Sequence, residues 1–386
     1  MNKYNCLLLA LILVSCSSEK KSERIKEKDF GFSYIIDTVM IDAGDEFLFL
    51  NMDLYFSDYS SKEGLLYNLN PQSGRVEVID LKNRKLAKLI QYELEGPNGI
   101  LEMALLGLKK ASSGDSFFMD YYSINHLDAT DAKIASYRLT NDFLNGEKLA
   151  KDEEINGMGN IDSNGEYFSS FYGNYQGKEE IRGIAQIHFA DSTLSLIPLD
   201  FWGDLDKYEI NMDPGGGRAI SAPEAKFLVA NGEDFIVSTT AKNELWQYSK
   251  ELDSVIHHQY SSQFTENIKP GKFPQTANNQ EEFDRLIQQK VDEVVFGSLV
   301  KDEVSGRFYR YSRERDKSDN KYTYVLTIFN ENLAQLHEEK MREEVSIPGK
   351  YVPGNKTFVH DGMLYSFLNI EDEMAFIRLK PTFTNE

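Results

Sequence analysis

Short stretches of alternating apolar and polar residues recur along most of the chain, and a polar turn separates each stretch from a partner. Alternation with a period of two is typical of a β-strand with one buried face. Six pairs of such stretches follow one another at intervals of roughly 50–70 residues, which is typical of a repeated unit. The pairs span residues 65–69 and 75–80, 116–122 and 134–139, 167–172 and 184–189, 234–239 and 244–248, 307–311 and 324–329, and 363–368 and 374–379.

Further strands extend these pairs toward four strands per unit. Residues 88–94, 193–198 and 255–260 follow a pair, and residues 103–108 and 226–230 precede one. Several pairs begin just after an Asn-Gly or Asp-Gly dipeptide, which supplies the positive φ of a tight hairpin. The pattern therefore predicts an all-β fold, a six-bladed β-propeller of four-stranded blades. Seven blades and a large β-sandwich are the alternatives.

The two ends of the chain predict how the ring closes. The sixth unit stops after its third strand, and residues 34–41 form a lone strand ahead of the first unit. An unpaired edge strand invites aggregation, and propellers avoid it by closing on themselves. We therefore expect the N-terminal strand to be the fourth strand of the last blade.

One segment has a helical pattern instead. Within residues 279–295, apolar residues recur near the spacing of one helical face. Asn279 is suited to cap this helix, and Glu281 and Glu282 lie in the first turn, where the helix dipole favours acids. We expect one short helical insertion on a face of the ring. Its apolar stripe would cover an end of the propeller or dock a partner.

The N-terminus has the features of an export signal. Lys3 precedes an apolar run that is far shorter than the ~20 residues needed to span a bilayer. Leu13-Val14-Ser15-Cys16 resembles the bacterial lipobox, in which Cys16 would carry lipid and begin the mature chain. An ordinary signal peptide is the alternative. The predicted division is a lipoprotein signal peptide (1–15), the lipidated cysteine with a charged tether (16–30) and the propeller domain (31–386).

Composition narrows the compartment and the partners. Cys6 leaves with the signal and Cys16 carries lipid, so the core alone must stabilise the mature domain. The formal net charge of −20 argues against a nucleic-acid partner and against electrostatic adhesion to anionic lipid. We expect a lipid-anchored protein of the cell envelope, in the outer membrane on its periplasmic or surface side. Its contact with the membrane would be the lipid on Cys16.

Catalytic signatures are missing or incomplete in the sequence. The stretch His337-Glu338-Glu339-Lys340-Met341 lacks the second histidine of a zinc-binding helix, and no P-loop or Gly-x-Ser-x-Gly motif occurs. The six histidines have no ligand spacing, so the sequence predicts neither a metal site nor a cofactor. Two carboxylates facing each other across the channel would be the exception, because such a pair can perform acid–base chemistry on sugars.

One glycine-rich loop is a candidate anion site. Asp213-Pro214-Gly215-Gly216-Gly217-Arg218 joins the third and fourth units, and successive N–H groups of such a loop can surround a carboxylate or phosphate. Glu95-Gly96-Pro97-Asn98-Gly99 enters the second unit at the equivalent place, so both loops should share one face of the ring. Asn98, Asp213 and Arg218 are therefore the candidate ligand-binding residues. The alternative for the glycine-rich loop is a flexible turn.

Three stretches resemble a known family. They are Glu95-Gly96-Pro97-Asn98-Gly99-Ile100, the helix at 279–295, and Ser305-Gly306-Arg307-Phe308-Tyr309-Arg310-Tyr311. Together with the lipobox and the charged tether, they make the chain similar to the six-bladed β-propeller lipoproteins of Bacteroidetes-type bacteria, a family of unknown function. The resemblance implies a propeller over nearly the whole mature chain, and it implies no catalytic residue.

Three functional hypotheses follow from these observations. The leading one is a membrane-anchored envelope lipoprotein that binds or scaffolds a protein, peptide or glycan through one face of the propeller. An enzyme is less favoured, and its form would be a polysaccharide hydrolase or lyase with carboxylates in the channel. A purely structural component of the envelope is the third.

Overall fold

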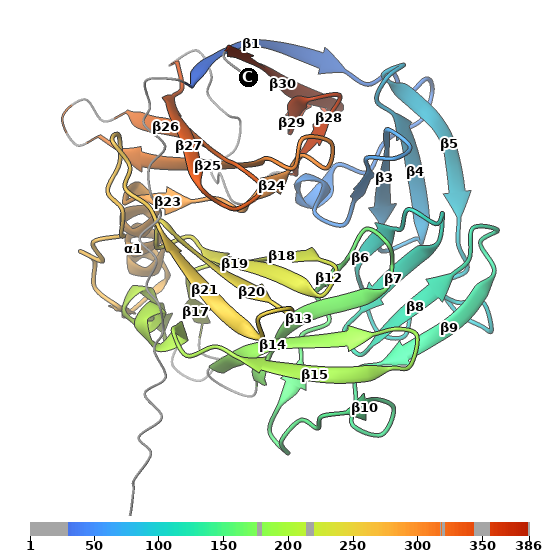
Figure 1. Cartoon of the computed structure of the whole chain (residues 1–386). Coiled ribbons are helices and arrows are strands. Elements are labelled where there is room, and N and C mark those ends of the chain that lie inside the picture. Colours follow the sequence, from blue (N-terminus) through green and yellow to red (C-terminus); the bar gives the residue numbers. More distant parts are fainter. Residues whose placement is uncertain are drawn as a thin grey trace, which may run out of the picture.

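The computed structural model describes residues 30–175, 180–213, 220–316, 318, 321–342 and 356–384, and these residues form a propeller-like all-β fold. Their strands belong to seven sheets, of which six have at least four strands and one has three. The six larger sheets stand around a common centre in Figure 1. The all-β propeller prediction is thus confirmed in its architecture, while the number of blades stays a prediction.

Within most of the larger sheets, the strands follow one another in chain order from the inner to the outer edge. The first three sheets contain β28 (Thr357–His360), β29 (Met363–Ile370), β30 (Glu373–Thr384) and β1 (Gly31–Met40); β2 (Asp58–Ser60), β3 (Leu65–Asn70), β4 (Arg75–Asp80) and β5 (Lys85–Gln91); and β6 (Leu105–Lys110), β7 (Ser116–Asp120), β8 (Ser123–Leu127) and β9 (Lys133–Arg138).

The next three sheets continue around the ring. They contain β11 (Glu154–Ile155), β12 (Asn160–Ile161), β13 (Tyr167–Asn174), β14 (Glu180–His188), β15 (Thr193–Pro198) and β10 (Asn145–Gly146); β18 (Lys226–Asn231), β19 (Asp234–Thr239), β20 (Glu244–Ser249) and β21 (Ser254–Gln259); and β23 (Val295–Phe296), β24 (Val300–Lys301), β25 (Phe308–Arg315), β26 (Tyr322–Phe329) and β27 (Gln335–Lys340).

The remaining elements are a small sheet and three helical segments. They are β16 (Ile210–Met212), β17 (Ile220–Ala222) and β22 (Thr276–Ala277), the helix α1 (Gln280–Asp292), and the 3-10 helices η2 (Asn51–Leu54) and η3 (Trp202–Tyr208).

The N-terminal strand closes the ring as predicted. β1 pairs antiparallel with β30 along its whole length, from Gly31 opposite Thr384 to Met40 opposite Ala375. In Figure 1 the blue start of the described chain therefore lies beside its dark red end. Strands from the two ends of the chain therefore complete one four-stranded sheet, in which β1 is the outer strand.

One predicted strand pair is wrong. The pattern placed residues 116–122 beside 134–139, but β8 lies between β7 and β9 and pairs with both. β8 was missed because buried polar side chains interrupt its alternation. Its Asn125 donates to the carbonyl oxygen of Ile100 at 2.9 Å, and the ring of His126 stacks on Phe117 with a centroid distance of 4.1 Å. Polar groups with such partners can be buried at little cost.

Apolar residues are buried between each sheet and the next, in place of one central core. Tyr67 and Leu69 of the second sheet share a buried cluster with Phe118 of the third. The last interface follows the same rule, because Leu326 of the sixth sheet and Leu364 of the first share another cluster. Each sheet is therefore stabilised by its two neighbours, and closure of the ring gives every sheet two.

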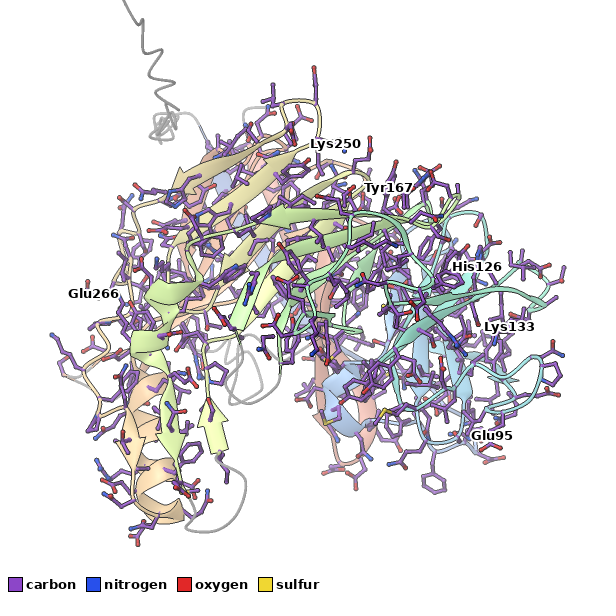
Figure 2. All side chains as sticks on the ribbon, turned by 90° about the horizontal axis from the view of Figure 1, so that it is seen from below. Glu95, His126, Lys133, Tyr167, Lys250 and Glu266 are labelled. Carbon is purple, nitrogen blue, oxygen red and sulfur yellow. The ribbon has the colours of Figure 1, made fainter. Side chains whose placement is uncertain are left out.

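The predicted helical insertion is present as α1. The side chain of Asn279 caps it by accepting a hydrogen bond from the N–H of Glu282 at 2.9 Å, as predicted. Phe283 and Leu286 are buried in one cluster with residues of the small sheet, and Lys290 lies 3.1 Å from the buried Glu224 carboxylate. The apolar stripe thus packs on a small sheet that the sequence did not predict. Together they project from one side of the ring in Figure 2.

The order of strands gives the ring two different faces. Because neighbouring strands are antiparallel, the turn between second and third strands and the connection to the next sheet emerge on the same side, which we call the crossover face. The turns between first and second and between third and fourth strands emerge on the other side, the hairpin face. Figure 2 shows both: Glu95, in the β5–β6 connection, lies on the side where α1 projects, and Lys250, in the β20–β21 turn, lies opposite.

Candidate functional site in the central channel

A channel of about 520 Å³ lies at the centre of the ring. It is lined by residues of the inner strands of all six larger sheets, namely β2, β6, β12, β18, β24 and β28. This volume lies within the range of small-molecule sites, which is roughly 300–1,000 Å³. The fold therefore creates one shared cavity out of six separate sheets.

The channel lining is rich in lysine. Among the described lining residues, the ionisable acids and bases other than tyrosine are six lysines and two carboxylates, an excess of four positive charges. This local excess contrasts with the net charge of −20 for the whole chain. The six lysines are Lys62, Lys109, Lys110, Lys226, Lys301 and Lys356, and the two acids are Asp58 and Glu303.

The lysines near the crossover end surround the start of β2. Lys109 Nζ lies 3.3 Å from Asp58 Oδ1, while the other carboxylate oxygen accepts the backbone N–H of Lys110 at 2.9 Å. Lys356 Nζ donates to the carbonyl oxygen of Ser57 at 2.5 Å. Burial lowers the pKa of Lys356, and the charge of Asp58 partly offsets this effect. Asp58 is therefore the one carboxylate recorded near two channel lysines.

The lysines near the hairpin end have mostly neutral partners. Lys62 Nζ donates to the carbonyl oxygen of Ser112 at 2.6 Å, and Lys110 Nζ donates to the hydroxyl of Ser116 at 3.0 Å. Lys301 is the exception, because its Nζ lies 2.9 Å from Glu303 Oε2. Neutral oxygens hold an ammonium group in place without cancelling its charge.

Large apolar side chains are exposed mainly on the crossover face. Met52 is 65% exposed and Met103 is 60% exposed, whereas exposed apolar residues of the hairpin-face turns are few in the described chain. Exposed apolar residues that gather in one place mark binding surfaces more often than scattered ones do. Those in crossover connections and turns are Phe47, Met52, Tyr55, Met103, Tyr121, Tyr122, Phe143, Met158, Phe264 and Ile268; those in hairpin-face turns are Leu252 and Val304.

Four of the exposed apolar residues, which we call the mouth group, lie in the channel lining or in segments bonded or packed next to it: Tyr55, Met103, Tyr121 and Met158. Tyr55 and Met158 line the channel itself. The neighbouring Gly157 packs so closely that a Cβ there would lie 2.2 Å from the carbonyl oxygen of Asp120, next to Tyr121. The backbone N–H of Met103 is bonded to the carboxylate of Asp120. These contacts connect the segments of Met103, Tyr121 and Met158, and Tyr55 adds a fourth segment through the channel lining.

Two fully buried carboxylates fix the connections of this face. Both oxygens of Glu77 lie 3.0 Å from the backbone nitrogen of Phe49, in the β1–β2 connection. Asp120 Oδ2 accepts hydrogen bonds from all three backbone N–H groups of residues 102–104, at 2.8–3.1 Å, in the β5–β6 connection. Charge-assisted bonds of this kind are about twice as strong as neutral ones. The connections around the channel are therefore held rigidly.

The β1–β2 connection also contains backbone strain. Met52, Asp53 and Leu54 have φ values of 60°, 51° and 60°, in the left-handed region that non-glycine residues rarely adopt. Each such residue costs roughly 1–2 kcal/mol. Leu54 is buried, while Met52 is exposed to solvent on the crossover face. Strain that persists in a structure tends to cluster at functional sites.

The sequence-predicted ligand residues lie away from the channel. Asn98 is exposed in a β-turn that the Gly99 N–H closes onto the Gly96 carbonyl oxygen at 3.0 Å. Asp213 follows β16 in the small sheet. Both are in links between larger sheets, hence on the crossover face, but neither lines the channel. Arg218 and Cys16 lie outside the described residues. The binding role of these residues stays a prediction.

Sequence reasoning missed the lysine-rich channel. Lys226 opens β18, Lys110 ends β6 and Lys301 ends β24, so the signal is a lysine at an end of an inner strand. It becomes visible only once the inner strands are known.

Two further searches cover the described part of the chain. No group of three or more His, Cys, Asp and Glu side chains there is arranged to hold a metal ion. No helix within the same residues has the length and apolar character needed to cross a membrane.

A family model titled "Domain of unknown function (DUF4221)" matches residues 29–340. The chain belongs to the DUF4221 family. A solved member of this family from Bacteroides vulgatus is similar over 92% of this chain and 99% of its own, with a TM-score of 0.62 and 13% identity. A candidate exported protein from Bacteroides fragilis is similar over 95% and 98%, with a TM-score of 0.50 and 10% identity. No curated protein matches the chain.

The DUF4221 match confirms the predicted family of unknown function. At these identities the two solved structures support the shared fold alone, and the family description assigns no activity. Any function has to be argued from the site.

Proposed function

We propose that this DUF4221 protein is a lipid-anchored binding protein of the cell envelope that takes up its ligand at the crossover mouth of the central channel. The observation that carries the proposal is the coincidence of three features at one place. A channel of about 520 Å³ passes through the ring, Tyr55 and Met158 of the exposed mouth group line it, and buried Asp120 holds the backbone of Met103. A rigid site loses little entropy on binding, which favours affinity.

The envelope part of the proposal rests on the N-terminus. Leu13-Val14-Ser15-Cys16 has the form of a lipobox, and one structurally similar protein is described as a candidate for export. Two or three acyl chains give stable anchoring, because each buried CH₂ contributes ~0.8 kcal/mol. The Cys16→Ser variant should therefore move from the membrane fraction to the soluble fraction. A variant that stays in the membrane fraction would contradict the lipid anchor.

The binding part is tested with matched variants of the two faces. A panel of soluble oligosaccharides and short peptides is screened by thermal shift against the full chain. At least one compound should raise Tm of the wild type. Met103→Ser and Tyr121→Ser should remove that rise, whereas Leu252→Ser and Val304→Ser should keep it. If the hairpin-face variants remove the rise instead, the ligand binds elsewhere and this assignment is wrong.

The enzyme alternative gains no support from the channel. Of the described lining residues, only Asp58 and Glu303 are carboxylates, and each lies in an ion pair with a lysine. A glycosidase instead needs two carboxylates placed on either side of the scissile bond. We therefore carry binding forward as the function, and any turnover of an oligosaccharide in the panel would reopen the alternative.

A further inference from the structure

Three of the six channel lysines are held by neutral oxygen atoms. Lys62, Lys110 and Lys356 bond to neutral oxygen atoms of the chain. Such bonds satisfy the donors of an ammonium group and leave its charge intact. Lys109 and Lys301 each lie beside a carboxylate.

The surroundings strengthen the attraction of this charge for an anion. The channel walls are built from packed sheets, and a cleft with low-dielectric walls and charges of one sign focuses the field within it. Burying positive charge in such a cleft is unfavourable when no anion is bound. Lys356 is an example, because its burial lowers the pKa and so disfavours the charged form. A bound anion would relieve both the mutual repulsion of the lysines and the desolvation of Lys356. The whole chain has a net charge of −20, so the excess of lysine is confined to this cavity. A bound anion would stabilise it by neutralising part of that positive charge.

We propose that the channel binds a small oligoanion, meaning a compact ligand with two or more carboxylate, phosphate or sulfate groups. This inference rests on the proposed function, since it assumes that the channel is the ligand site. The shared chemistry is the set of anionic groups, and either an acidic oligosaccharide or a free phosphorylated compound would supply it. The described lining has an excess of four positive charges, which is complementary to a ligand with several negative charges.

The size of the site favours a small ligand over a folded protein partner. A stable protein interface buries about 800 Å² on each partner. The charged part of this site lies inside a channel of about 520 Å³, which a folded surface cannot enter. A protein would contact only the apolar mouth group and leave the lysines unmatched.

The test measures binding by isothermal titration of the full chain, purified in detergent. The probes are tripolyphosphate, trigalacturonate, the neutral trisaccharide maltotriose and an acidic tetraglutamate peptide. We expect tripolyphosphate, trigalacturonate or both to bind, with affinity that falls as salt is raised because salt screens charge interactions. Binding of trigalacturonate alone would identify an acidic saccharide as the ligand class, and binding of tripolyphosphate alone a phosphorylated compound.

Lysine variants connect that binding to the channel. Lys226→Gln and Lys356→Met should each weaken oligoanion binding about tenfold, as expected when one charge-assisted contact is lost. Lys226→Arg keeps the charge and should retain most of the affinity. Lys250→Gln is the matched control, because Lys250 lies in an exposed turn on the opposite face and should leave affinity unchanged (Figure 2). Circular dichroism of each variant separates loss of binding from loss of folding.

The remaining outcomes separate the two proposals. If neither oligoanion binds, or if Lys250→Gln weakens binding as much as Lys226→Gln, the oligoanion inference is overturned. Binding of maltotriose that the mouth variants remove and the lysine variants leave intact would overturn it as well, while the proposed function would stand. Binding of tetraglutamate alone would also overturn the inference and would assign the lysines to an acidic peptide. A further outcome is oligoanion binding that is unchanged in the mouth variants and weakened in Lys226→Gln. That result would support the channel as the anion site and would contradict the role of the mouth group in binding.

Discussion

The two faces of the ring are built by different means. On the hairpin face, turns are stabilised locally: Asp162, after β12, accepts the backbone N–H groups of Glu166 and Tyr167 at 2.8 and 2.7 Å. On the crossover face, Asp120 instead holds residues 102–104, which lie sixteen or more positions earlier in the chain. The hairpin face is thus a set of independent turns, whereas the crossover face depends on contacts between distant segments.

This difference teaches where a propeller of this kind can acquire a function. The local turns of the hairpin face are short and polar, so they offer little surface to a ligand. Connections held by buried acids are longer, and they can present apolar residues such as Met52 and Met103 in fixed positions on the crossover face. Backbone strain at 52–54 also lies on this face. The crossover face, which contains the buried acids and the strained backbone, is therefore the face that has the features of a binding site.

The largest expected effect comes from removing Asp120. Asp120→Ala leaves three backbone N–H groups without their partner, and each buried donor left unpaired costs about 1–3 kcal/mol. Asp120→Ala should lower the free energy of unfolding by ~3–5 kcal/mol and speed hydrogen exchange at residues 102–104. Asp162→Ala is the matched change on the hairpin face. It should cost only ~1–2 kcal/mol, because a local turn can rearrange. Equal losses in chemical denaturation would remove the distinction between the faces.

The next effect concerns the channel acids. Asp58→Asn removes a negative charge at the crossover end, where Lys109 lies 3.3 Å away. It should tighten tripolyphosphate binding about three- to fivefold, since one partly buried charge is worth ~1 kcal/mol. Glu303→Gln makes the same change in a more exposed residue near the hairpin face and should alter the affinity less than about twofold. Titration calorimetry checks both, and a larger gain for Glu303→Gln would place the ligand at the other end.

A smaller effect follows from the left-handed turn. Met52→Gly removes an exposed side chain from a residue with a φ of 60°, so the relieved strain should exceed the added entropy of the unfolded chain. The free energy of unfolding should rise by ~0.5–1 kcal/mol. Leu252→Gly is the control: Leu252 is 61% exposed and has no positive φ, so glycine there should destabilise. Loss of stability in Met52→Gly would mean that the turn is not strained.

The smallest effect is a pH dependence at the hairpin end of β28. Burial lowers the pKa of His360, whose Nδ1 lies 2.9 Å from the hydroxyl of Tyr59. Below the usual histidine pKa of about 6.5, the unfolded chain binds this proton more readily than the folded chain, so stability falls on acidification. His360→Gln should reduce that fall by at most ~1 kcal/mol, because the charge of Asp361 offsets part of the effect of burial on the pKa of His360. Thermal melts between pH 5 and 7 check this.

Most of the fold could be predicted from the sequence, because strand alternation and Asn-Gly or Asp-Gly turns are local signals. The pairing of β1 with β30 followed from one missing strand at the end of the chain. β8 could not be found, since the partners that allow Asn125 and His126 to be buried lie on other segments. The small sheet was missed as well. Its strands are two or three residues long, which is too short to show an alternation of apolar and polar residues.

The candidate site could hardly be predicted at all. Asn98 and Asp213 were chosen because glycine-rich loops are conspicuous, and the structure places them outside the channel lining. Lysines such as Lys226 and Lys356 are far apart in the sequence and meet only because the inner strands share one axis. Their excess is also hidden by the acidic composition of the whole chain. A site assembled from six sheets has no local signature.

Protection of lysines by a bound anion tests the central claim most directly. The full chain is labelled with an amine-reactive reagent with and without tripolyphosphate, and the labelling of each lysine is measured by mass spectrometry. The account predicts that labelling of Lys109, Lys226 and Lys356 falls at least threefold when tripolyphosphate binds. Lys133 and Lys250, which are not among the channel-lining residues, should be labelled as before. Equal protection of all five lysines, or none at Lys109, Lys226 and Lys356, would contradict an anion site in the channel.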